Sequence, residues 1–333
     1  MQQEKRPTNR WRALVVLLLA WNLAAQDFQI RTRVDLVVVP VSVKGDDDKL
    51  INGLTKDDFV LLEDGKKQEI TNFSNEPVPL SAAVLIDTGL SPASFTRVKD
   101  SVIALAGAFS DQDEVAVYRF DHLIVKMTDF TNNLSMVESV LKKLDQIEPS
   151  PNTTFIGPGP FSTPGPVING IPIEPVTRAR IPPERAKVLN DAIFAAAEDL
   201  RSREVERRKM ILVVSDGQNS GNDHSFDDTV NRLLDQGIQV YAVGMDSALL
   251  SRRLSVLGSY ANATGGDACF VNSQNSLEAC YSRSAVQARN QYVLGYVSTN
   301  KPPGGAPVFR EIKVQVARGD LETRHRKGYF QAP

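Results

Sequence analysis

Two apolar runs that each end in an aspartate constrain the fold of this chain more than any other feature. The first run, residues 82–86, leads into Asp87, and the second, residues 210–214, leads into Ser215 and Asp216. Apolar runs of this length are typical of strands that are buried on both faces, as in parallel sheets covered by helices. Such sheets bind ligands at the carboxyl ends of their strands. The sequence therefore predicts an α/β fold with a site at Asp87 and Asp216.

The pattern around the two runs predicts a doubly wound, mostly parallel sheet of Rossmann-like topology. Between residues 80 and 289, short apolar segments alternate with helix-length segments, which indicates right-handed crossovers between parallel strands. Helices are expected, among others, at 93–109, 184–202, 225–236, 247–258 and 275–289. We therefore predict one α/β domain over residues 80–289.

The two flanks of this domain have β character instead. Residues 34–45 are rich in β-branched side chains, and residues 311–316 alternate strictly between polar and apolar. Neither flank is large enough to bury a core alone. We expect the N-terminal β unit, 28–79, and the C-terminal strands, 290–333, to pack as a small β-sandwich-like domain around the inserted α/β domain. Three consecutive aspartates, 46–48, are expected in a solvated turn.

The first 25 residues have the layout of a secretory signal peptide. Basic residues precede an apolar run at 13–20, and small residues follow at Ala24 and Ala25. The apolar run is short for a transmembrane span, although an uncleaved anchor is the alternative. We expect an exported protein, periplasmic or secreted, that has no membrane span after signal cleavage.

Charge and cysteine content bear on the partners and the compartment. A net charge of −2 over 333 residues shows no electrostatic footprint for nucleic acid, so we expect no nucleic-acid partner. The two cysteines, Cys269 and Cys280, could form a disulfide in an oxidising compartment. Two separate buried thiols are the alternative.

Residues 149–183 form an insertion that is dense in proline and glycine and has little helical or strand periodicity. A segment of this length and composition is either an extended linker or a functional loop near the site. The sequence leaves both interpretations open.

Three motifs in this order resemble a von Willebrand factor A-type (VWA) domain. They are Asp87-x-x-x-Ser91, the helical segment 189–193, and Ser215-Asp216-Gly217. The flanking segments resemble an acidobacterial subgroup of VWFA-related proteins, namely residues 34–41, 53–59, 62–66, 292–296 and 326–329. The resemblance implies a bacterial protein with a role in adhesion or complex assembly.

The resemblance also implies the ligands of a metal-ion-dependent adhesion site. Asp87, Ser91 and Asp216 match three ligand positions of that motif. Gly89 stands where the motif has its first serine, and the motif threonine falls near Lys187. The expected site is therefore degenerate.

Two outcomes for this degenerate site remain open at the level of sequence. Water could complete the coordination of a weakly bound Mg²⁺, Mn²⁺ or Ca²⁺, and Thr153, Thr154 or Thr177 of the insertion could supply the missing hydroxyl. Alternatively, the Lys187 ammonium could pair with Asp87 or Asp216 and neutralise the site without a metal.

The leading functional hypothesis is an exported, non-enzymatic protein-binding module of adhesion type. Its partner is expected to be another protein, bound through an acidic side chain if a cation is present. A hydrolase is the alternative, with Ser91 or Ser215 and one of His122, His224 and His325, although the Gly-x-Ser-x-Gly elbow is absent. A metal-free structural scaffold is the third hypothesis.

Overall fold

The computed structural model describes residues 36–46, 48–147, 167–168, 171–172, 187–249 and 255–333. The expected signal peptide and most of the 149–183 insertion, with Thr153, Thr154 and Thr177, lie outside the described residues. Within the described ranges, no helix is long and apolar enough to cross a membrane.

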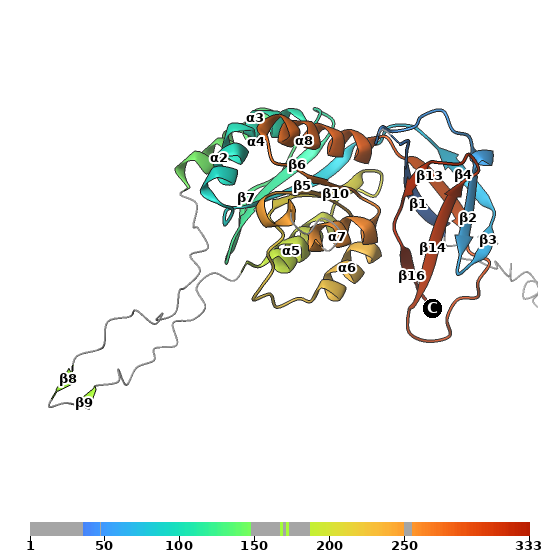
Figure 1. Ribbon diagram of the computed structural model, residues 1–333. Helices are drawn as coiled ribbons and strands as arrows, with labels where there is room; N and C mark the ends of the chain where they lie inside the picture. The colour runs from blue at the N-terminus through green and yellow to red at the C-terminus, as the bar shows by residue number, and fades with distance from the viewer. Residues whose placement is uncertain (1–35, 47, 148–166, 169–170, 173–186, 250–254) are drawn as a thin grey trace, which may run out of the picture. The chain divides into compact units, whose positions relative to one another are not determined.

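A six-stranded sheet lies at the centre of the α/β region (Figure 1). Its strand order is β12 (Ala268–Phe270), β11 (Gln239–Gly244), β10 (Arg208–Ser215), β5 (Leu80–Asp87), β6 (Glu114–Phe120) and β7 (Ile124–Thr131). All neighbours are parallel except β6 and β7. Every residue of β5 is buried, because helices cover both faces of the sheet.

Two helical layers enclose this sheet (Figure 1). One layer contains α2 (Pro92–Asp100), α3 (Val102–Gly107), α4 (Leu134–Lys142) and α8 (Gln274–Arg289). The other contains α5 (Leu189–Arg201), α6 (Phe226–Asp235) and α7 (Val256–Thr264). Each layer buries its own apolar cluster against the sheet. The doubly wound α/β architecture predicted from the two apolar runs is therefore confirmed.

Two of the predicted helices are divided in the structure. The segment 93–109 forms two helices, which meet at Ser101, where the hydroxyl donates to the carbonyl of Val98 (2.9 Å). The helix expected at 247–258 is a short 3-10 turn, η3 (Asp246–Leu249), followed by α7. The start of α7 is set by Ser255, whose hydroxyl accepts from the backbone of Leu257, and its end by Gly265 at φ +80°.

The flanking strands form two four-stranded antiparallel sheets. One has the order β15 (Glu322–Arg324), β1 (Leu36–Lys44), β13 (Tyr292–Val297) and β4 (Ile70–Ser74). The other has the order β16 (Gly328–Gln331), β14 (Val308–Val316), β2 (Phe59–Glu63) and β3 (Lys66–Gln68). The two sheets share one apolar cluster. Strands from both ends of the chain thus build one β-sandwich, as predicted.

The remaining described elements are short. They are two 3-10 helices, η1 (Lys56–Asp58) and η2 (Lys143–Gln146), and a two-stranded pair of β8 (Val167–Ile168) and β9 (Ile171–Pro172).

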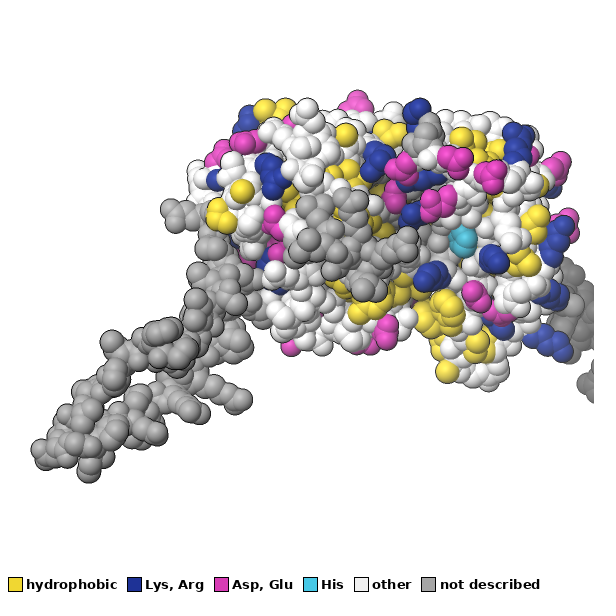
Figure 2. Space-filling view, viewed as in Figure 1, with side chains coloured by type: hydrophobic (Ala, Val, Ile, Leu, Met, Phe, Trp, Pro, Cys, Tyr) yellow, Lys and Arg dark blue, Asp and Glu magenta, His cyan; other side chains and the backbone are white. Residues whose placement is uncertain are grey.

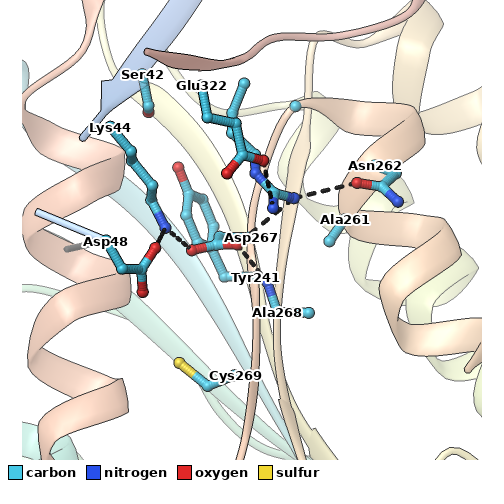
Figure 3. A network of polar contacts seen from close by, with 12 residues as sticks. Ser42, Lys44, Asp48, Tyr241, Ala261, Asn262, Asp267, Ala268, Cys269 and Glu322 are labelled. Atoms are coloured by element: carbon cyan, nitrogen blue, oxygen red, sulfur yellow. Dashed lines mark hydrogen bonds and ion pairs between the residues drawn. The ribbon is translucent and has the colours of Figure 1, made fainter. Parts of the chain in front are cut away.

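An ion-pair network around the buried Lys44 connects strand β1 to the edge of the α/β sheet (Figure 3). The Lys44 ammonium at the end of β1 pairs with Asp267, which directly precedes β12, and lies 2.7 Å from Asp48. Asp267 also lies 3.6 Å from Arg324 of β15. Asp46 and Asp48 are exposed, as expected for a solvated turn, and the Asp48 carboxylate also pairs with Lys44 and, at 2.7 Å, with Arg283.

A disulfide between Cys269 and Cys280 joins β12 to α8 beside this network. Both cysteines are buried. The guanidinium of Arg283 lies 2.7 Å from the sulfur of Cys269. The disulfide and the ion pairs together hold the end of β12 in place.

Candidate functional site

Strand register places Asp87 beside Ser215 at the carboxyl end of the sheet. Ile86 of β5 pairs with Val214 of β10, so the next residue of each strand lies at the same level. The Ser215 hydroxyl donates to Oδ2 of Asp87 (2.8 Å). The Gly89 backbone amide donates to Oδ1 of the same carboxylate (2.8 Å). Both oxygens of Asp87 are therefore held by the turn and the neighbouring strand.

Asp216 leaves the sheet one residue after Ser215. Gly217 turns the chain with φ +73°, a conformation that glycine adopts without steric cost. The Gln218 backbone amide then donates to Oδ1 of Asp216 (3.0 Å). This tight turn directs the other oxygen, Oδ2, toward Lys187.

The Lys187 side chain lies between the two carboxylates. Its Nζ is 3.1 Å from Oδ2 of Asp87 and 2.8 Å from Oδ2 of Asp216. The side chain of Lys187 is 3% exposed, that of Asp87 is 0% exposed, and that of Asp216 is 6% exposed. The sequence left open whether this site binds a metal ion or a lysine. In the structure, Lys187 pairs with both aspartates.

The backbone around Lys187 is tied to two other loops. Its carbonyl accepts from the amide of Ser220 (2.8 Å), and the next amide, Val188, donates to the carbonyl of Asp121 (2.9 Å). These contacts lie just before α5 and aim the lysine side chain across the end of the sheet. Its position is therefore built into the fold and does not depend on the side-chain pairing alone.

The charges at this site do not balance if both carboxylates are ionised, because one ammonium faces two carboxylates. Burial raises the pKa of Asp87, and the nearby charge of Asp216 adds to that rise. The charge of Lys187 and the hydrogen bond from Ser215 act in the opposite direction. A protonated Asp87 beside a Lys187–Asp216 ion pair would be neutral overall.

Gly89 leaves the space that the lysine side chain uses. A β-carbon at this position would lie 2.9 Å from Cε of Lys187 and 3.2 Å from Oδ1 of Asp87. Both distances are shorter than ordinary van der Waals contact. The residue that departs from the adhesion motif thus makes room for the lysine.

Ser91 lies outside this cluster. It is the N-cap of α2, where its hydroxyl accepts from the backbone of Ser94 (3.3 Å). Its amide donates to Asp246 (3.1 Å), a residue that the sequence analysis did not single out. No hydrogen bond joins Ser91 to Asp87, Asp216 or Lys187 in the described part of the chain. The position of Ser91, four residues after Asp87, is the one that caps the start of α2.

The described side chains do not fit a bound Mg²⁺, Mn²⁺ or Ca²⁺ in this arrangement. Such ions need about six oxygen ligands. The ammonium of Lys187 occupies the space between the two carboxylates, Gly89 supplies no side-chain oxygen, and the hydroxyl of Ser91 caps a helix. Within the residues that the structure describes, no group of three or more His, Cys, Asp or Glu side chains could hold a metal ion.

An asparagine network that the sequence analysis missed fastens loop 217–224 to the start of α5. The buried Asn190 accepts from Nδ2 of Asn219 (2.8 Å) and from the hydroxyl of Tyr260 (2.7 Å), and it donates to the carbonyl of His224 (3.1 Å). Asn222 accepts from the amide of Asp191 (3.3 Å). Because α5 has no side-chain cap of its own, the side-chain oxygens of Asn219 and Asn222 accept from its first N–H groups, those of Asn190 and Asp191. In the sequence, the asparagines at 219 and 222 were the signal that could have indicated this network.

His224 does not form a Ser–His pair. Its Nδ1 lies 2.8 Å from Oδ1 of Asp191, and its ring stacks on Phe194 with centroids 3.8 Å apart. Burial raises the pKa of Asp191, but three hydrogen bonds from Asp223 and His224 outweigh that effect and lower it. In the described residues, no histidine is hydrogen-bonded to Ser91 or Ser215.

The other two histidines are also placed away from these serines. His122 is half exposed and lies 3.0 Å from Asp121. His325 lies in the β-sandwich, where Nε2 accepts from the amide of Val314 (3.1 Å) and Nδ1 lies 2.9 Å from the carbonyl of Arg326. These contacts assign the neutral tautomer with a proton on Nδ1.

Residues 176–282 match the family model of the von Willebrand factor type A domain. The matched segment contains Lys187 and Asp216, and β5 with Asp87 lies before it. No curated protein matches the sequence.

Several solved structures resemble this chain. An aerotolerance-related membrane protein from Bacteroides fragilis is 14% identical, with a TM-score of 0.42, over 62% of this chain and 99% of that one. BatB from Bacteroides thetaiotaomicron is 13% identical, with a TM-score of 0.42, over 63% and 98%. Proximal thread matrix protein 1 from the mussel byssus, solved with a zinc-occupied MIDAS motif, is 15% identical, with a TM-score of 0.43, over 68% and 49%.

Proposed function

We propose that this chain is an exported, non-enzymatic protein-binding module in which Lys187, rather than a divalent cation, fills a VWA-type site. The observation that carries the proposal is the position of the Lys187 ammonium, 2.8 Å from Asp216 and 3.1 Å from Asp87. A lysine side chain that fills the site in place of a metal makes partner binding independent of divalent metals.

The proposed binding surface comprises the loops at the carboxyl ends of the parallel strands. They are residues 88–94, 121–123 and 217–224. Leu123 is 61% exposed there and is available for contact with a partner. The asparagine network holds loop 217–224 in one conformation, so less ordering is needed on binding. Because Lys187 is buried, this surface offers no cation to an acidic side chain of the partner.

Two observations favour a protein partner over a substrate or a nucleic acid. Ser215 donates to a carboxylate rather than to a histidine, which does not fit an activated nucleophile. The surface in Figure 2 has basic and acidic side chains interspersed rather than gathered by sign. Nucleic-acid binding usually needs a basic patch.

The proposed location and domain organisation rest on the sequence and the disulfide. The signal-like N-terminus and the Cys269–Cys280 disulfide support export to a periplasmic or extracellular compartment of a bacterium. The flanking motifs support membership of the acidobacterial VWFA-related subgroup. We take residues 80–289 as the VWA domain, and 28–79 with 290–333 as the accompanying β-sandwich.

Calorimetric titration with Mg²⁺, Mn²⁺ and Ca²⁺ tests the metal-free site. We expect no binding heat from any of the three ions. Binding that is abolished by Asp216→Ala would show a working metal site and would contradict the proposal. Asp46→Ala is the matched control, since it removes a carboxylate that lies outside the site.

Partner binding can be tested with a photo-crosslinking side chain in place of the exposed Leu123 in the native host. We expect a crosslinked protein whose yield is unchanged by a chelator. A crosslinker at position 66, on strand β3 of the sandwich, is the control. Crosslinking that requires a divalent ion, or that is equal at both positions, would contradict the proposal.

A further inference from the structure

We propose that Lys187 and Asp216 form an intramolecular isopeptide bond, with Asp87 as the catalytic residue that transfers the protons. Lys187 Nζ lies 2.8 Å from Oδ2 of Asp216 and 3.1 Å from Oδ2 of Asp87. The structure thus shows the amine donor, the carboxyl acceptor and a second carboxylate in contact. This proposal assigns a covalent modification to the site and is independent of which partner it binds.

Burial is the first condition for the reaction. In water the ammonium and the carboxylate are both well solvated, and neither reacts with the other. Removal from water makes the charged pair less favourable relative to the neutral amine and carboxylic acid. Lys187 is 3% and Asp216 is 6% exposed, so little solvent reaches the pair.

The second condition is stabilisation of the charge that develops on the attacked carboxyl group. Attack by Nζ on Cγ of Asp216 moves negative charge to one carboxyl oxygen. Oδ1 already accepts from the backbone amide of Gln218 (3.0 Å). A fixed N–H donor at this distance is the arrangement that stabilises such an oxyanion.

The third condition is a proton carrier, and Asp87 occupies that position. Its Oδ2 contacts Nζ, while the Ser215 hydroxyl and the Gly89 amide fix the orientation of the carboxylate (both 2.8 Å). Burial raises the pKa of Asp87, which favours a carboxyl group that can take up and release a proton.

The reaction balances without any co-reactant. One proton passes from the Nζ ammonium to Oδ2 of Asp216, which gives an amine and a carboxylic acid. Nζ then bonds to Cγ of Asp216. Asp87 takes a second proton from Nζ and delivers it to the departing oxygen. The Cγ–Oδ2 bond breaks, one water leaves, and nothing is oxidised or reduced.

Gly89 and the backbone of Lys187 keep the reacting atoms close together. A side chain at position 89 would meet Cε of Lys187, so glycine permits the approach. The backbone contacts of Lys187 and Val188 hold the base of the lysine in place. Such positioning is the main advantage of an intramolecular reaction.

Peptide mapping by mass spectrometry of the full, purified chain tests the proposal. After reduction, alkylation and trypsin digestion, we expect peptide 186–201 linked to peptide 210–232, with a combined mass lower by one water. The bond at Lys187 should be uncut, and fragmentation should place the link on Asp216. Asp87→Asn keeps the size of the side chain but removes the proton carrier, and it should give unlinked peptides. Lys187→Arg should also be unlinked.

Two results would overturn the proposal. One is recovery of both peptides unlinked from folded wild-type protein, with cleavage at Lys187. The other is a link to Asp87 instead of Asp216. Circular dichroism of Asp87→Asn shows whether that variant is folded, and the wild-type digest decides the proposal even if the variant is not.

Discussion

A β-carbon at position 89 would lie 2.9 Å from Cε of Lys187, so the absence of a side chain at Gly89 and the position of the lysine are complementary. Gly89 and Lys187 are 98 positions apart in the sequence, and Asp87 and Lys187 are 100 positions apart. A serine at 89, which the adhesion motif would have, would require the end of the Lys187 side chain to shift. The glycine is therefore part of the lysine site.

Gly89→Ser should destabilise the protein, because the new side chain would overlap with Lys187. We expect a loss of roughly 1–3 kcal/mol, the usual cost of overpacking a buried site. Urea unfolding followed by circular dichroism measures this loss.

Gly107→Ser is the matched control for that measurement. Nothing lies within 4 Å of a β-carbon at this position, so its stability should change little. In a Lys187→Ala background, Gly89→Ser should cost less than it does in the wild type, because the alanine vacates the space. If Gly89→Ser were as stable as wild type, the steric relationship would be wrong.

Lys187→Met should destabilise the protein at neutral pH, because two carboxylates would then face each other without a cation. Removal of one partner from a buried ion pair costs roughly 3–5 kcal/mol. The variant should also gain stability when Mg²⁺ or Ca²⁺ is added, whereas the wild type should not. Thermal unfolding with each ion and with a chelator measures both effects, and an ion response of the wild type would contradict the prediction.

The positions of Asp87 and Asp216 followed from the sequence, because an apolar run determines where a buried strand ends. The position of the Lys187 side chain did not, since it depends on backbone contacts with Ser220 and Asp121, which are distant in the chain. Local spacing was also misleading for Ser91. Its hydroxyl was assigned to the site, but it caps α2, a role that a serine before Pro92 fits equally well.

Asn190→Ala should weaken the attachment of loop 217–224 to α5. Asn190 makes three buried side-chain hydrogen bonds, to Asn219, Tyr260 and His224. Each is worth about 1 kcal/mol, so we expect a loss of roughly 2–3 kcal/mol. Hydrogen exchange of the backbone amides in loop 217–224 should become faster as well.

Asn222→Ala is the control variant. It removes a half-buried side chain of loop 217–224 and should reduce stability less than Asn190→Ala does. Equal costs for the two variants would contradict the assigned role of Asn190.

Loss of the Cys269–Cys280 disulfide should destabilise the end of β12. The two cysteines are 11 residues apart in sequence, so the closed loop is short and its contribution is roughly 2–3 kcal/mol. Urea unfolding of wild type with and without a reductant measures it. The double variant Cys269→Ser/Cys280→Ser is the control, since its stability should not respond to the reductant. A wild type that is equally stable in both conditions would contradict the prediction.

His325 should make the β-sandwich less stable in mild acid. Burial lowers the pKa of His325 below its usual value of 6.5, although its hydrogen bond to the carbonyl of Arg326 opposes the shift. Below pH 6.5 the unfolded chain therefore binds a proton that the folded protein binds less readily. The contribution to stability is complete above pH 6.5 and decreases as the pH falls toward the lower folded-state pKa. The amide of Val314, which donates to Nε2, would lose its acceptor when that nitrogen is protonated.

Urea unfolding measured from about pH 7.5 to about pH 5 tests this prediction. The free energy of unfolding should decrease less for His325→Gln than for wild type, because the titrating group is gone. Equal decreases in the two proteins would mean that His325 does not contribute to the acid sensitivity of the fold.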